Sequence, residues 1–199
     1  MQKKVSAKDG SLKANHLKPG EMVSTDQYVS KQLGRLPHTR GKESDKERYV
    51  GGTIYVDEAS GLVFVQHQVS LNAAETIRGK HLFEREAGTC GVSIRNYRGD
   101  NGVYKSADFV KDLNNRNQTI RYSGVGAHHQ NGVAERAIRT ISESARAMIL
   151  HAAIHWPEAT TMDLWPLAMD YAVYLWNRMP RKDSGMAPLE IFCGCKLDK

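Results

Sequence analysis

The alternation of hydrophobic and polar positions predicts a chain that begins with strands and becomes more helical towards its end. Runs rich in β-branched and aromatic residues predict five strands, at residues 22–29, 49–56, 62–68, 92–98 and 119–122. A polar excursion separates the first two strands. The turn-forming sequence at 57–61 predicts an antiparallel hairpin between the second and the third.

Helical spacing of apolar positions predicts four helices, at residues 71–87, 106–116, about 134–149 and 166–178. In the third helix the apolar residues keep the spacing of one buried face: Ala134, Ala137, Ile138, Ile141, Ala145, Met148 and Ile149. Strands that first form a hairpin and later alternate with helices favour an α/β layer fold built on a mixed sheet.

A length of 199 residues suits one domain with an appendage rather than two full domains. Residues 1–20 lack periodic apolar positions, so we expect a tail or linker there. The predicted core spans residues 21–156, and residues 157–199 are predicted to form a helical extension of that core.

Basic residues outnumber acidic ones by 28 to 22, which gives a formal net charge of +6 and a pI near 9.2. This excess favours a polyanionic partner, although a solvated basic surface without a partner has the same signature. The sequence contains no run of 18 apolar residues and no apolar stretch typical of a signal peptide, so we expect a soluble, non-secreted protein without a membrane span. The odd number of cysteines, Cys90, Cys193 and Cys195, predicts a reducing compartment and no disulfide framework.

Three acidic residues occupy unusual settings: Asp26 lies inside a predicted strand, Asp100 at the end of one, and Glu135 in the first turn of a helix. Asp26 is hard to explain as structure, because Asp is disfavoured in strands. The other two have structural alternatives. Asp100 suits a Gly-Asp-Asn-Gly turn, and Glu135 suits the positive end of a helix dipole or an ion pair with Arg139.

Together the three carboxylates predict metal-dependent chemistry. A cluster of carboxylates from separate elements is what two Mg²⁺ ions about 3.5–4 Å apart require, and mutual repulsion makes such a cluster costly without metal. The ions would activate a water or a 3′-hydroxyl for in-line attack on phosphorus, so no nucleophilic side chain is needed. The sequence offers no convincing Ser-His-Asp or Cys-His set and no phosphate-binding Gly-Lys-Ser/Thr loop.

These residues resemble the Asp, Asp, Glu signature of retroviral and retrotransposon integrases. The segments that carry the resemblance are Asp26, 98–102 (RGDNG) and 130–136 (QNGVAER), and the last is similar to the copia type in particular. Residues 164–180 and 187–190 resemble the segments that follow copia cores. The likeness covers about residues 21–199.

The resemblance implies an RNase H-like fold: a five-stranded mixed sheet, in the order 3-2-1-4-5, flanked by helices. It also implies a polynucleotidyl transferase that uses two Mg²⁺ (or Mn²⁺) ions, held by Asp26, Asp100 and Glu135, for 3′-end processing and strand transfer of element DNA into target DNA. The implied partners are double-stranded DNA and further copies of the chain. The implied locations are the nucleus and a cytoplasmic virus-like particle.

The sequence departs from the family pattern in two respects. Asp100 and Glu135 are separated by 34 residues, one fewer than in retroviral integrases, which a shorter glycine-bearing loop at 123–127 accommodates. No His-His-Cys-Cys zinc module is recognisable before the core, so we expect a fragment or a decayed copy. Asp57 competes with Asp26 for the first carboxylate, but its Asp-Glu-Ala-Ser-Gly context favours a hairpin turn.

Candidate DNA contacts surround Glu135. Arg136 lies beside it and Arg139 one helical turn further on, where arginines would hold phosphates without reading sequence. The alternative is a solvated face on which Arg139 pairs with Glu135 and Glu143. Three further candidates precede the helix or lie at its start: Asn131, Gln130 and His129.

Two other functions stay open at this stage. A transposase or nuclease would use the same metal chemistry, and an assay that separates end joining from plain cutting distinguishes it. A catalytically silent DNA-binding or assembly module is the other, although three retained, mutually repelling carboxylates argue against it.

Overall fold

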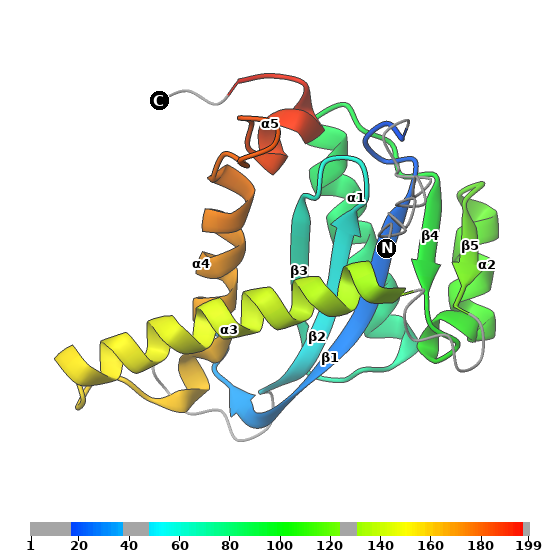
Figure 1. The fold of residues 1–199 in the computed structure, drawn as a ribbon. Coiled ribbons are helices and arrows are strands. Elements are labelled where there is room, and N and C mark those ends of the chain that lie inside the picture. Colours follow the sequence, from blue (N-terminus) through cyan, green and yellow to red (C-terminus); the bar gives the residue numbers. More distant parts are fainter. Residues whose placement is uncertain (1–16, 38–47, 124–130, 197–199) are drawn as a thin grey trace, which may run out of the picture.

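A five-stranded sheet forms the centre of the computed structural model, which describes residues 17–37, 48–123 and 131–196 (Figure 1). Its strands are β1 (Val23–Gly34), β2 (Tyr49–Asp57), β3 (Val63–Gln68), β4 (Asn96–Gly99) and β5 (Thr119–Tyr122). Their order is β3-β2-β1-β4-β5. Since β1 pairs antiparallel with β2 and parallel with β4, the sheet is mixed. The predicted fold class and strand order are confirmed.

Helices cover both faces of this sheet. They are α1 (Ala73–Thr89), α2 (Ala107–Asn115), α3 (Gly132–His155), α4 (Trp165–Arg178) and α5 (Pro188–Cys193), with short 3-10 turns η2 (Val103–Lys105) and η4 (Met162–Leu164). One apolar cluster packs α3 and α4 against β1, β2 and β3, and a second packs α1 and α2 on the other face. Figure 1 shows α3 crossing in front of the sheet. In the part of the chain that is described, no helix is long and apolar enough to cross a membrane.

Side-chain alternation in the strands produces these two layers. In β2, Ile54 faces α3, whereas the neighbouring Tyr55 faces α1 and stacks on Phe83 with ring centroids 5.1 Å apart. On α3 the predicted apolar face is the buried one, since Ala134 and Ile141 lie in the first cluster. The sheet is therefore covered on both sides.

β1 is longer than predicted. It continues to Gly34 instead of ending near Val29, because after a register irregularity Gly34 pairs again with Tyr49. The strand end also packs closely on α4, where a Cβ on Gly34 would collide with Pro166.

β4 is shorter than predicted. It begins at Asn96 instead of residue 92, because Val92 donates its backbone N–H to Ala87 and so completes the end of α1. Gly91, at φ +72, makes the left-handed turn that this ending requires.

A disulfide joins Cys90, at the end of α1, to Cys193 in α5. The prediction of no disulfide is therefore wrong. An odd number of cysteines shows only that one is left over, and here that residue is the exposed Cys195. The pairing depends on α5 returning to the α1 layer, where Phe192 is buried in the second apolar cluster.

Removing this bond should destabilise the fold, because it spans 103 residues of sequence and constrains the unfolded chain. We expect Cys193→Ser to lower the free energy of unfolding by about 2–4 kcal/mol in denaturant titrations without reductant. Reductant should lower wild-type stability by the same amount, and Cys195→Ser should behave like wild type. Equal stability of wild type and Cys193→Ser without reductant would contradict the pairing.

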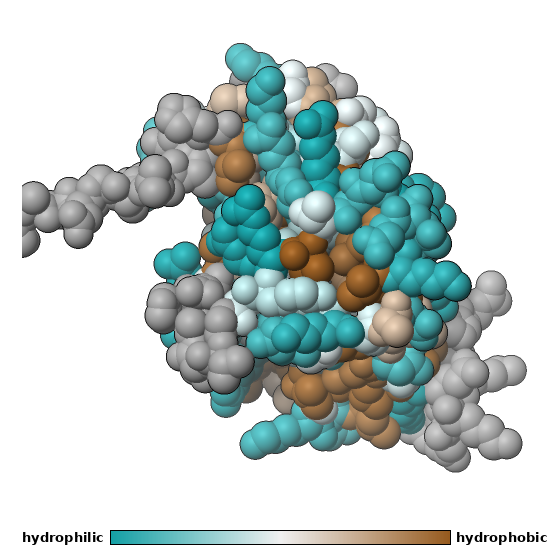
Figure 2. All heavy atoms as spheres, turned by 90° about the vertical axis from the view of Figure 1, so that its right-hand side faces the viewer, coloured by the Kyte–Doolittle hydropathy of each residue, from teal (hydrophilic) through white to brown (hydrophobic). Residues whose placement is uncertain are grey.

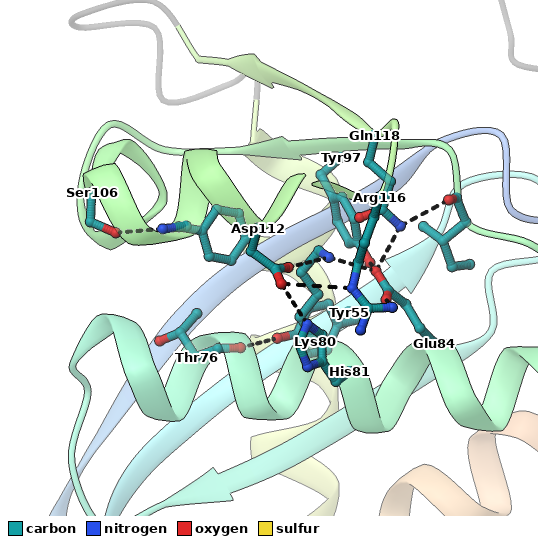
Figure 3. Close-up of polar contacts among 12 residues, drawn as sticks. Tyr55, Thr76, Lys80, His81, Glu84, Tyr97, Ser106, Asp112, Arg116 and Gln118 are labelled. Carbon is teal, nitrogen blue, oxygen red and sulfur yellow. Dashed lines mark hydrogen bonds and ion pairs between the residues drawn. The ribbon is translucent and has the colours of Figure 1, made fainter. Parts of the chain in front are cut away.

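A network of charges binds α1 to α2 on the face away from α3 (Figure 3). Lys80 is fully buried, and its Nζ lies 2.8 Å from oxygens of both Glu84 and Asp112. Burial opposes ionisation of Asp112, but hydrogen bonds from Lys80 and His81 outweigh it and hold the pKa of that carboxyl below its ordinary value. Glu84 also accepts hydrogen bonds from three other side chains: Tyr97, Arg116 and Gln118. The two partly buried acids of this Lys80 network, Glu84 and Asp112, are thus paired with a buried cation.

Candidate active site

The parallel pairing of β1 with β4 places Asp26 and Asp100 at neighbouring positions. Ser24 pairs with Arg98, so Asp26 lies two residues beyond this pair in β1, and Asp100 directly follows Gly99, the last residue of β4. Asp26 pairs with Ile54 across β1 and β2, and Ile54 belongs to the cluster under α3. Asp26 therefore lies on the face that α3 covers, and the charge of Asp100 is near enough to raise its pKa.

Glu135 reaches this face from the first turn of α3. Asn131 precedes the helix and is buried, with 3% of its surface exposed. Its Nδ2 lies 3.4 Å from the carbonyl oxygen of Thr25, and its side chain is near enough to Asp26 to lower the pKa of that carboxyl. These contacts hold the start of α3, which carries Glu135, over β1, and the charges of both Asp100 and Glu135 act on Asp26.

Asp26 is the electrostatically unusual member of this group. Burial raises its pKa most, Asp100 and Glu135 raise it further, and hydrogen bonds from the Gln27 backbone and Asn131 lower it, with a result of about 6. Within the described residues, no cation is among the main causes of this shift, whereas a cation pairs with the acids of the Lys80 network. A partly buried carboxylate that is repelled by two others is typical of a functional site.

Asp100 is exposed and is held in a turn after β4. The backbone N–H of Gly102 donates to its Oδ1 at 3.0 Å, and Asn101 bonds the carbonyl oxygen of Ser123 at 3.2 Å. Asp100 therefore does form a turn, and this turn lies at the end of β4, level with the first residues of β1 that include Asp26.

The donor set suits a hard divalent cation, because carboxylate and amide oxygens are its preferred ligands. The Oδ1 of Asn131 is buried and has no hydrogen-bond partner within the described residues, so a hydrated cation at Asp26 would give this atom a partner. Over the same residues, however, no three His, Cys, Asp or Glu side chains lie close enough to hold a metal ion. Asp26 and Asp100 each bond a nearby backbone N–H, so we expect metal binding to rotate at least one carboxylate inward.

Asp57 has a structural role. It is fully buried, and its carboxylate accepts hydrogen bonds from the backbone N–H groups of Gly20 and Ser60 and from the Ser60 hydroxyl. These bonds close the β2–β3 turn, and the hairpin interpretation is confirmed.

The predicted DNA contacts fall into three groups. Arg136 and Arg139 are exposed on α3, and in the described parts of the chain Arg139 forms no ion pair with Glu135 or Glu143. Asn131 is buried, so its position favours holding α3 and Asp26 rather than touching DNA. The two other candidates, Gln130 and His129, lie outside the described residues, as does most of the glycine-bearing loop.

The contact between Asn131 and β1 could not be seen in the sequence. An Asn before a helix predicts a side-chain cap on that helix, yet Asn131 makes no such bond. The Asn131 amide lies near Asp26, and not against the backbone of its own helix, because α3 packs on the sheet at this point. The sequence offered one indication that Asn131 belongs to the site, namely its position four residues before Glu135.

No protein-family model matches the chain, and neither does any curated protein sequence. Solved structures do match. The HTLV-2 integrase catalytic core domain, solved with magnesium in a trimeric form, has a TM-score of 0.63 and 17% identity, over 88% of this chain and 98% of that one. The fold is that of a retroviral integrase catalytic core.

Two further matches agree with this integrase-core fold. The BIV integrase catalytic core domain has a TM-score of 0.60 and 16% identity, over 88% of this chain and 95% of that one. A chain of the simian T-cell lymphotropic virus intasome has a TM-score of 0.67 and 15% identity, over 92% of this chain and 58% of that one. The predicted RNase H-like, five-stranded sheet is thereby confirmed.

The raised pKa of Asp26 predicts how stability depends on pH. Unfolding returns the pKa from about 6 to about 3.8, so ionisation of Asp26 opposes folding. The cost is absent below the lower value, grows as the pH rises, and is fully present above about 6. We expect Asp26→Asn, without divalent metal, to raise the free energy of unfolding at pH 7.5 by about 1–2 kcal/mol, a figure reduced for partial solvation.

Denaturant unfolding in EDTA at several pH values measures this effect. The gain should shrink as the pH falls towards 4. Glu143→Gln, an exposed change further along α3, should give no such trend. A gain for Asp26→Asn that is independent of pH would show that charge is not its cause.

Proposed function

We propose that this chain is the catalytic core of a copia-type integrase, a metal-dependent polynucleotidyl transferase that processes DNA 3′ ends and joins them to target DNA. The observation that carries the proposal is the raised pKa of Asp26, on which the charges of Asp100 and Glu135 both act, in a chain with an integrase-core fold. The similarity of QNGVAER at 130–136 to copia sequences favours this type.

Asp26, Asp100 and Glu135 would hold two Mg²⁺ or Mn²⁺ ions in this reaction. When bound, the ions supply activation of the attacking hydroxyl and neutralisation of charge at the scissile phosphate. Support for the metal comes from the donor set and from the HTLV-2 cores, which are solved in complex with magnesium. The fold supports this role: the β1–β4 pairing brings Asp100 near Asp26, and Asn131 holds the start of α3, which carries Glu135, over β1.

Double-stranded DNA is the proposed substrate. Arg136 and Arg139 are exposed next to Glu135, where their guanidinium groups would hold phosphates. The overall charge of +6 supports the same partner. We also propose that the chain acts as a homo-oligomer, in line with the dimeric and trimeric forms of the HTLV-2 core.

Glu135→Gln tests the role of the third carboxylate, because it keeps the side-chain volume and removes the charge. Joining of labelled duplex ends in Mg²⁺ should fall to background, and the Mg²⁺-induced rise in melting temperature should shrink. DNA binding in EDTA should stay near wild type, and stability without metal should be equal or higher. Glu143→Gln, two helical turns further along α3, is the matched control and should retain all of these properties.

Joined and merely cut products are to be scored separately on the same gel. If Glu135→Gln joins ends at the wild-type rate, the three-carboxylate mechanism is wrong. Wild-type protein that cuts but never joins would instead indicate a nuclease on the same fold.

A further inference from the structure

A groove with arginines on two of its sides lies beside the candidate active site. It has a volume of about 460 Å³ and runs between the first turns of α3, the β2–β3 turn and the chain just after α4. Its apolar walls are Val56, Val63, Val133 and Ala137. Two guanidinium groups line it, those of Arg136 from α3 and Arg181 from beyond α4.

Arg181 is held in place before any ligand arrives. One of its terminal nitrogens donates to the carbonyl oxygen of Gly61 at 3.2 Å, and its guanidinium lies 5.4 Å from the ring centre of Trp176. Gly61 has φ +69, and a Cβ there would collide with this guanidinium. The glycine at residue 61 therefore suits both the left-handed turn and the observed position of the Arg181 guanidinium.

The acids that line the groove are already satisfied. The Asp57 carboxylate accepts three hydrogen bonds, one from the backbone N–H of Gly20 and two from Ser60. The Glu58 carboxylate accepts a hydrogen bond from Ser24 at 2.7 Å and forms an ion pair with Arg98 at 3.0 Å. Within the described residues, neither groove arginine pairs with a carboxylate. The groove thus presents guanidinium donors whose charge is not neutralised by its own walls.

We propose that this groove, termed here the α3–hairpin groove, binds phosphodiester groups of DNA outside the candidate metal site, through Arg136 and Arg181. The inference rests on the proposed function. Arg136 directly follows Glu135, so the groove begins next to the candidate carboxylates and leads away from them towards the β2–β3 turn. This continuity favours a DNA strand over an acidic protein segment, and the apolar walls suit the faces of its sugars and bases.

Arg181→Ala is the direct test, by fluorescence anisotropy with a labelled duplex oligonucleotide in EDTA at several salt concentrations. We expect roughly 3–10-fold weaker binding at fixed salt and a salt dependence lower by about one unit of slope. Arg178→Ala is the matched control: Arg178 also stacks on an aromatic ring, at 3.8 Å from the centre of Tyr174, but does not line the groove. It should bind like wild type.

A second variant approaches the groove from its other wall. Thr140→Glu places a carboxylate in the groove from α3 without altering Arg181, and should weaken DNA binding to a similar degree. If Arg181→Ala fails to fold, this variant decides the question. Ser144→Glu, one helical turn further and outside the groove, controls for added negative charge on α3.

The outcomes separate the groove from the proposed function. Wild-type affinity in both groove variants, with weaker binding by Arg139→Ala, overturns the groove and leaves the proposed function standing. Equal losses in the groove variants and in their controls also overturn it, since the effect is then general electrostatics. Wild-type protein that binds no DNA overturns both.

Discussion

The register between β1 and β4 is the constraint on which the candidate site depends. Val23 pairs with Tyr97, and both side chains are fully buried on the α1 face. A slip of one residue would expel one of these side chains from the core and turn Asp26 or Asp100 to the wrong face. Packing on one side of the sheet therefore fixes the chemistry on the other side.

Partly buried acids occur in two opposite electrostatic settings in this molecule. In the Lys80 network, Glu84 and Asp112 share a buried cation and several donors, so their charges serve to join α1 to α2. At Asp26, burial is combined with two further carboxylates and with no cation, so the charge opposes folding. This unfavourable charge on folded Asp26 has a physical reason if binding of a divalent cation neutralises it. The hydrophilic side chains that predominate over the β4–β5 side of the molecule (Figure 2) are compatible with a polar ligand approaching there.

Local patterns in the sequence predicted the elements but not their long-range contacts. The run of β-forming residues at 119–122 predicted β5 at its observed bounds, and the Asp-Glu-Ala-Ser-Gly stretch predicted the β2–β3 turn. Both signals are contained within a few consecutive residues. The extension of β1 to Gly34 depends on α4, and the Cys90–Cys193 bond depends on the position of α5. The inward turn of Asn131 and the anchoring of Arg181 on Gly61 likewise join residues that are distant in sequence, and no local pattern encodes such a meeting.

The central claim is that Asp26, Asp100 and Glu135 form one metal site, which requires their side chains to move closer together than they lie among the described residues. The most direct measurement is a crystal structure soaked in Mn²⁺, with the ion located by its anomalous scattering. The account predicts an anomalous peak bonded to Asp26 and Asp100, with at least one carboxylate rotated away from its backbone N–H and with Glu135 turned towards the same centre. A peak at another acidic cluster, or an empty site at saturating Mn²⁺ in crystals that leave this face open to solvent, would contradict it.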